Sequence, residues 1–227
     1  MNISNKSIII NIVLFALYFV ISLITYIVVD NFLHIFLVWN LFLAAIPFGI
    51  VFFLDRKIIK CKVGVVIVLL LWLFFFPNAI YIITDLIYID VSEFVEVSGI
   101  YEQTNYLKSI SPYLALFHIY LGAFIGLLYG MKSIFALYDM SKKTQIKKYK
   151  DFIVIGVFFL SGLAIYIGRF FRYNSWEILR VFDIIKDLIN NFSGFTIFFV
   201  LSMTLLQCII FYSIKFNFNN KKTLKDF

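Results

Sequence analysis

Long apolar runs alternate with short polar stretches along the whole chain of 227 residues. An α-helix rises about 1.5 Å per residue, so crossing about 30 Å of bilayer hydrocarbon takes about 20 mostly apolar residues. Six runs approach or exceed this length, and the remaining connections are short. We therefore predict one all-α transmembrane domain, a polytopic helical bundle over residues 1–227, with spans at about 8–29, 32–54, 63–89, 112–137, 152–167 and 192–214.

Composition supports the membrane interpretation. Hydrophobic residues make up 63% of the chain and charged residues 15%, whereas a soluble domain carries roughly a quarter charged residues. Such an apolar chain is neither a soluble enzyme nor a disordered protein. Since Cys61 and Cys208 are the only cysteines, a disulfide-stabilised scaffold is excluded as well.

The distribution of lysine and arginine predicts the orientation. Six spans place both termini on the same side of the membrane. Fifteen of the 20 basic residues fall on that side, when Lys132 is counted with the loop that carries Lys142 to Lys150. Basic loops stay on the cytoplasmic side, so we predict that both termini are cytoplasmic. This topology accounts for the net charge of +7, and we predict no nucleic-acid partner, because no folded domain displays the basic residues.

Polar residues inside the third span form an ordered pattern. Pro77 removes a backbone donor, so we expect it to kink or break the helix. Beyond it, Asn78, Tyr81, Asp85 and Tyr88 recur at intervals of three and four, which places them on one face of an α-helix. Polar groups at membrane depth are costly and mark functional sites, so this stripe is our first candidate.

A second polar string ends the fifth span. Arg169 and Arg172 lie one turn apart, and Trp176 follows on the same side. This arrangement does not require a function, because arginine side chains extend to the membrane interface beside a belt of aromatic residues. However, the second and fourth spans enter from the same side and bring Asn40 and His118 to a similar depth.

His118 begins a stripe of small residues, followed at intervals of four by Gly122, Gly126 and Gly130. Such stripes let membrane helices approach closely, so we expect His118 to point into the bundle. There it either titrates or makes a structural hydrogen bond. The fifth span offers a similar edge of small residues, Ser161, Ala164 and Gly168.

The polar strings also carry a resemblance to a known family. They are Trp39-Asn40-Leu41 with Pro47, Phe76-Pro77-Asn78-Ala79 with Tyr81 and Thr84-Asp85, Gly168-Arg169-Phe170, and Arg172-Tyr173-Asn174-Ser175-Trp176. Together they resemble domain-of-unknown-function family 1361, an uncharacterised family of bacterial membrane proteins. The resemblance implies a multi-pass protein of the bacterial plasma membrane and implies no established activity.

Familiar catalytic and cofactor motifs do not occur. The sequence has no His-Glu-x-x-His zinc helix, no Walker loop and no Gly-x-Gly-x-x-Gly. Two histidines and two separated cysteines make a thiolate metal site improbable. We therefore predict no cofactor and no metal site, and the sequence leaves open whether the protein is an enzyme.

Three functions fit these residues. The preferred hypothesis is an outward-facing pocket for an anionic or phosphorylated envelope ligand, such as a lipid or lipid-linked sugar phosphate, which is bound or processed. Asp85 or His118 would serve as general base. The predicted binding residues are Asn40, Asn78, Tyr81, Thr84, Arg169, Arg172, Asn174, Ser175 and Trp176.

The alternatives use the same groups differently. In a small-solute or proton-coupled transporter, Asp85 would be the proton site of a broken helix. In a structural assembly partner, Asp85 would pair with Arg169 or Arg172 only to join two spans. The lipid bilayer is the partner in every case, and the sequence does not set the oligomeric state.

Overall fold

The computed structural model describes residues 5–56, 58, 61–96, 105–142, 145–173, 177 and 180–223. The chain forms two compact units, Met1–Ser133 and Ile134–Phe227. Within the described residues, six helices are long and apolar enough to cross a membrane: Ile8–Val29, Leu33–Asp55, Lys62–Tyr88, Ile110–Ser141, Lys147–Phe170 and Gly194–Asn217. The prediction of an all-α, multi-pass membrane protein is confirmed.

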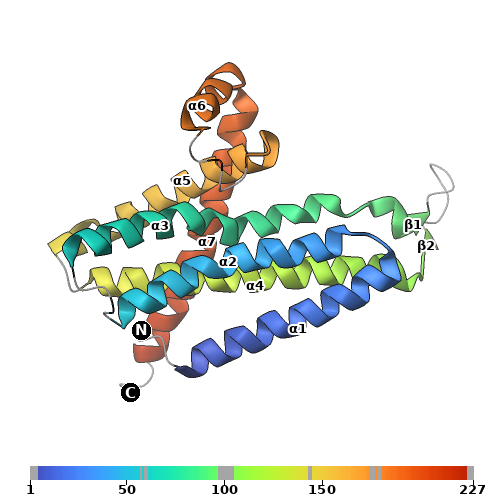
Figure 1. The fold of residues 1–227 in the computed structure, drawn as a ribbon, viewed down its shortest axis with the longest axis horizontal. Helices are drawn as coiled ribbons and strands as arrows, with labels where there is room; N and C mark the ends of the chain where they lie inside the picture. Colours follow the sequence, from blue (N-terminus) through green and yellow to red (C-terminus); the bar gives the residue numbers. More distant parts are fainter. Residues whose placement is uncertain are drawn as a thin grey trace. The chain divides into compact units, whose positions relative to one another are not determined.

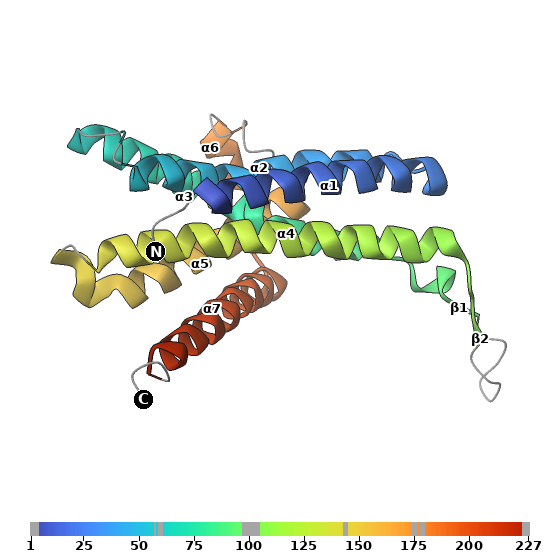
Figure 2. The same cartoon turned by 90° about the horizontal axis from the view of Figure 1, so that it is seen from below.

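The first unit contains α1 (Asn5–Val29), α2 (Leu33–Asp55), α3 (Lys62–Tyr81) and most of α4 (Ile110–Ser141). Figures 1 and 2 show these four helices running alongside one another, with α2 packed against both α3 and α1. Short connections between α1 and α2 and between α2 and α3 make these neighbours antiparallel.

The buried face of α2 explains this packing. Its buried positions follow alternating steps of three and four residues, so they form one stripe along the helix. The buried side chains that form this stripe are His34, Leu37, Leu41, Ala44, Phe48 and Val51.

The third span changes its helix type after the proline. We expected a kink or break at Pro77, but α3 continues through Pro77 to Tyr81 and then becomes a 3₁₀ helix, η1 (Ile82–Tyr88). Proline removes a single N–H, and the helix tolerates this loss. The change comes where the Thr84 hydroxyl donates to the Tyr81 carbonyl at 2.6 Å, and such back-bonding competes with the regular ladder.

The tighter helix alters the predicted polar stripe. In a 3₁₀ helix, residues three apart lie on the same side. Ile82 and Asp85 are buried accordingly. Tyr88 shares their side of the helix, but it is the last residue of the segment and is 52% exposed. The polar stripe is therefore divided between a buried and an exposed part.

A short structured connection follows η1. It contains the 3₁₀ turn η2 (Val91–Glu93) and a two-stranded antiparallel ladder of β1 (Val95–Glu96) and β2 (Asn105–Tyr106). Asp90 caps η2, because its carboxylate accepts hydrogen bonds from the hydroxyl and the amide of Ser92. These two bonds lower the pKa of Asp90 below its ordinary value.

The glycine stripe of α4 lies where it was predicted. His118 is 1% exposed. Gly122 faces the ring of Tyr18, Gly126 faces Ile82, and Gly130 faces Ala79. The close approach of α4 to α1 and to the third span thus depends on positions without a side chain.

The second unit contains the end of α4, the 3₁₀ turn η3 (Gln145–Tyr149), α5 (Lys150–Phe170), α6 (Val181–Asn190) and α7 (Gly194–Thr223). Helices α5 and α7 pack closely, and a Cβ atom added at Gly162 would lie 2.9 Å from the Val200 carbonyl oxygen. Ser161 is buried beside it, but Ala164 is exposed. The predicted close-contact edge is therefore wrong at Ala164, which lies outside the buried face of α5.

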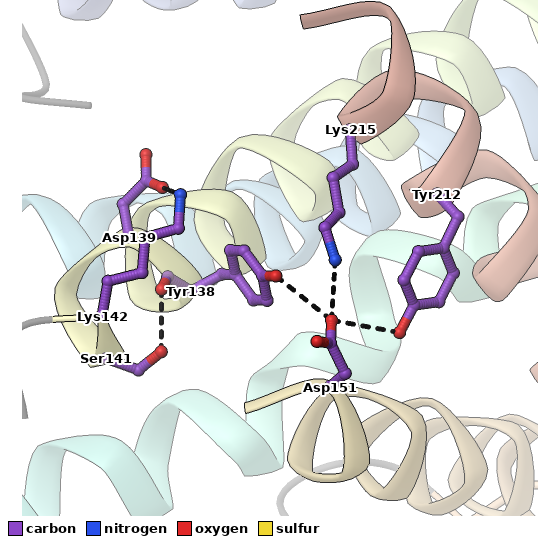
Figure 3. A network of polar contacts seen from close by, with 7 residues as sticks. All are labelled: Tyr138, Asp139, Ser141, Lys142, Asp151, Tyr212 and Lys215. Carbon is purple, nitrogen blue, oxygen red and sulfur yellow. Dashed lines mark hydrogen bonds and ion pairs between the residues drawn. The ribbon is translucent and has the colours of Figure 1, made fainter. Parts of the chain in front are cut away.

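A polar network joins the helix ends of this unit (Figure 3). The Asp151 carboxylate, at the start of α5, accepts hydrogen bonds from the Tyr138 hydroxyl at 3.1 Å and the Tyr212 hydroxyl at 3.4 Å. Lys215 adds an ion pair at 2.8 Å. One carboxylate thus connects α4, α5 and α7 at a single end of the unit.

The glycine stripe yields a stability prediction. We expect Gly126→Ala to lower the free energy of unfolding by about 1–3 kcal/mol, because the added Cβ would lie 2.5 Å from Ile82 and 3.2 Å from the Ala79 carbonyl oxygen. Thermal denaturation followed by size-exclusion chromatography measures the effect. Gly49→Ala is the matched control, since nothing lies within 4 Å of that position, and equal stability of the two variants would contradict the prediction.

Candidate functional site

The first unit buries several polar side chains among apolar helices. Six of the described ones are at most 2% exposed: Ser22, Thr25, His34, Asp85, His118 and Ser133. At membrane depth no water replaces a missing partner, so each buried polar group needs a hydrogen bond within the protein. The partners of these groups therefore define what the site can do.

Asp85 is the buried carboxylate of this unit. The 3₁₀ helix η1 directs it inward, where it is 1% exposed, and the Asn40 amide of α2 donates a hydrogen bond to its Oδ2 at 3.1 Å. A hydrogen bond to an ionised acceptor is stronger than one between neutral groups. Two residues that the sequence proposed for one site, 45 positions apart, are thus in direct contact.

A second cluster connects three helices through the two histidines. The rings of His34 and His118 face each other with their Nδ1 atoms 3.0 Å apart, and His118 Nε2 lies 2.6 Å from the Ser22 hydroxyl. The Ser22 hydroxyl in turn donates to the carbonyl oxygen of Tyr18 at 2.7 Å. The chain of contacts therefore runs from α2 through α4 to α1.

One arrangement of the ring protons satisfies all of these contacts. Because the single Ser22 proton goes to the Tyr18 carbonyl, the Ser22 oxygen accepts from His118 Nε2–H. A neutral His118 then has a lone pair on Nδ1, which accepts from His34 Nδ1–H. Both ring nitrogens of His118 are thereby engaged, and every bond in the chain points toward one backbone carbonyl.

Tyr18 lies against the histidine chain. Its ring stacks on the His118 ring at a centroid distance of 4.7 Å and an angle of 13°. The aromatic ring therefore covers one face of the His118 imidazole.

Two other predicted residues of the third span, Asn78 and Thr84, bond to the backbone of the same span. The Asn78 amide donates to the Phe75 carbonyl at 3.1 Å, and the Thr84 hydroxyl donates to the Tyr81 carbonyl. Asn78, Tyr81 and Thr84 are all half-buried. These bonds stabilise the segment in which the helix type changes.

The predicted arginines belong to the second unit. Arg169 lies half-buried in the last turn of α5, and Arg172 is exposed just beyond it. Arg172 has a φ of 59°, which is a left-handed conformation uncommon for this residue type. Asn174, Ser175 and Trp176 lie outside the described residues, and the chamber predicted to join the arginines with Asp85 stays a prediction.

Comparison with known proteins places the site within a family. The family model described as "Protein of unknown function (DUF1361)" matches residues 39–210. The chain belongs to this family. The resemblance inferred from the polar strings is thereby confirmed. No curated protein and no solved structure matches the chain, so the DUF1361 match assigns no activity.

The matched segment of this DUF1361 protein contains all of the Asp85 cluster but only part of the histidine cluster. Asn40, Asp85 and His118 lie within it, whereas Ser22 and His34 precede it. Sequence reasoning missed both of the preceding residues as site components. His34 and His118 are 84 positions apart. The one signal in the sequence was that each histidine lies near the predicted outer end of its span.

Metal binding finds no support in these clusters. Across the part of the chain that the structure describes, no group of three histidine, cysteine, aspartate or glutamate side chains is arranged to hold a metal ion. The chemistry available to the DUF1361 chain at this site is therefore that of a carboxylate, an amide, a hydroxyl and two imidazoles.

The histidine chain predicts an asymmetry between two hydroxyls of α1. We expect Ser22→Ala to lower the free energy of unfolding by about 1–3 kcal/mol, because His118 Nε2–H would lose its buried acceptor. Thr25 is equally buried, but its hydroxyl bonds only within α1, to the Ile21 carbonyl. Thr25→Val is thus the control, and chemical unfolding in detergent measures the stability of both variants. If Thr25→Val lowers the free energy of unfolding as much as Ser22→Ala does, the histidine hydrogen bonds do not stabilise the bundle.

Proposed function

We propose that the protein is a proton-coupled carrier of the plasma membrane in which Asp85 takes up and releases the proton. The observation that supports this proposal is a carboxylate 1% exposed inside a membrane-spanning segment, held by a side-chain amide. Buried ionisable residues in spans are costly and occur in ion and proton pathways. Transporters also build their sites from helices whose regular backbone is interrupted, as it is between α3 and η1.

Asn40 suits both protonation states of Asp85. Its amide N–H donates to the Asp85 carboxyl group at 3.1 Å, a contact that suits the ionised form of the acid. Once the carboxyl is protonated, rotation of the amide presents its oxygen as an acceptor for the new O–H. The Asn40 contact therefore suits the acid before and after proton uptake, which a lysine or arginine in its place would not do.

The histidine chain fits a structural role beside this acid. Both ring nitrogens of His118 already have partners, and the chain ends at a backbone carbonyl, which has no proton to pass on. We assign the proton step to Asp85. We assign to the histidine hydrogen bonds the role of holding α1, α2 and α4 in a fixed arrangement around Asp85.

The proposal predicts a titrating carboxyl group. Infrared difference spectra of the purified chain in lipid, recorded between acidic and neutral pH, should contain a buried carboxyl band that Asp85→Asn removes. In proteoliposomes with an internal pH dye, a panel of amino acids, sugars and organic acids should include a solute that drives proton movement in the wild type and none in Asp85→Asn.

Asp139→Asn is the matched control, because Asp139 pairs with Lys142 at the helix end, outside the buried clusters. This variant should keep both the band and the proton movement. A wild-type spectrum without the Asp85 band would contradict the proposal. If Asp85→Asn is instead absent from the membrane while Asp139→Asn is abundant, the carboxylate is a structural contact.

A second candidate function is binding of an anionic or phosphorylated envelope ligand. The observation that favours it is the end of α5, where Arg172 is exposed in a left-handed backbone conformation just beyond Arg169. Sparsely populated conformations are often held at binding sites, and planar guanidinium groups suit phosphate oxygens. In this case the ligand is bound, transferred or hydrolysed with Asp85 as general base.

Lipid retention tests this candidate. In native mass spectrometry of the chain purified from its membrane, an anionic lipid or polyprenyl phosphate should remain bound to the wild type and be lost, by at least several-fold, in Arg169→Ala and Arg172→Ala. Arg180→Ala is the control, since Arg180 is exposed but already pairs with Glu177 and Asp183. Equal retention in all four proteins would exclude an arginine site for such lipids.

A further inference from the structure

Helix α6 has two chemically distinct faces. Its ten residues, Val181–Asn190, place all four polar side chains on one side of the helical wheel and all six apolar ones on the other. None of the ten is buried. The most exposed apolar side chains are Phe182 at 84%, Ile189 at 70% and Ile185 at 48%.

The polar face is tied to the segment that precedes the helix. The Tyr173 hydroxyl donates to the Asp187 carboxylate at 2.8 Å, and this bond raises the pKa of Tyr173. Arg180 forms ion pairs with Asp183 at 3.1 Å and Glu177 at 3.2 Å. These contacts fix the rotation of α6 about its axis, so that its apolar face is directed away from them.

The position of α6 in the chain restricts what can cover this face. Asn190 precedes Gly194, the first residue of a membrane span, by four residues. Four residues extend at most about 14 Å, so the end of α6 stays close to the membrane boundary. The helix is about 15 Å long, too short to cross the bilayer.

We propose that α6 lies in the membrane–water interface, with Phe182, Ile185 and Ile189 inserted among the lipid chains. Helices with separate apolar and polar faces bind there by burying the apolar face at the boundary between headgroups and acyl chains. A second copy of the chain fits less well, because a stable interface buries about 800 Å² per partner. One face of a helix about 15 Å long and about 10 Å wide offers well under that area.

Site-directed spin labelling tests this placement. The full chain, with Cys61→Ser and Cys208→Ser, receives one cysteine at Phe182, Ile185 or Ile189 and is reconstituted in phosphatidylcholine vesicles. Lys186 and Asn190, on the polar face, supply the control positions. We expect oxygen, which concentrates in lipid, to reach the three apolar positions, and a water-soluble nickel chelate to reach them several-fold less than the two controls.

Each other outcome overturns the proposal. Equal nickel accessibility at Phe182 and Lys186 would place the apolar face in water. Exclusion of both reagents at the apolar positions would show that protein covers the face. A separate measurement without spin labels checks that labelling has not displaced the helix. It uses Phe182→Trp and Lys186→Trp in the chain with its native cysteines. Lipids with brominated acyl chains should quench the tryptophan fluorescence more strongly in Phe182→Trp than in Lys186→Trp.

Discussion

The absence of water in the bilayer interior is the constraint on which the first unit depends. A polar side chain at that depth either finds a partner in the protein or destabilises the fold. Ser22, His118 and His34 meet this requirement with one chain of hydrogen bonds across three helices, in which each proton has a single acceptor. These hydrogen bonds form only in one arrangement of α1, α2 and α4. They therefore determine how the three helices pack, and they also stabilise that packing.

Short-range regularities made much of the fold predictable. Span length follows from the thickness of the bilayer, and glycines spaced four apart reveal a helix face without any knowledge of the neighbour. The face of α4 that bears Gly122, Gly126 and Gly130 is buried as predicted. On α5 the same reasoning failed at Ala164, which is exposed although Ser161 and Gly168 are in register with it, because a small residue lies on an exposed face as readily as on a buried one.

The buried clusters were only partly predictable, for a different reason. Asp85 and Asn40 were identified because a carboxylate or an amide in an apolar span is costly by itself. Ser22 gives no such signal, since a hydroxyl can bond to its own helix, as Thr25 does. Its role depends on His118, 96 positions away, and hence on which helix faces meet. That information is tertiary and does not appear in the spacing of residues along one span.

The basic residues serve both topology and packing. Lys132, counted from the sequence with the cytoplasmic loops, lies inside α4, where it is half-buried and donates to the Asn11 side chain at 2.8 Å. In the second unit, Lys215 pairs with Asp151 among the hydroxyls of Tyr138 and Tyr212. Long lysine side chains extend their amines toward the interface from within a helix.

The two polar clusters differ in whether their contacts can exchange a proton. In the histidine chain every donor has its acceptor, and adding a proton to His118 Nδ1 would set two N–H groups against each other. At Asp85 one neighbour is the Asn40 amide, which offers a donor on one side and an acceptor on the other. The proposed proton step therefore suits the Asp85 cluster better than the histidine chain. This contrast is why we place the chemistry of the protein at the carboxylate and its rigidity at the imidazoles.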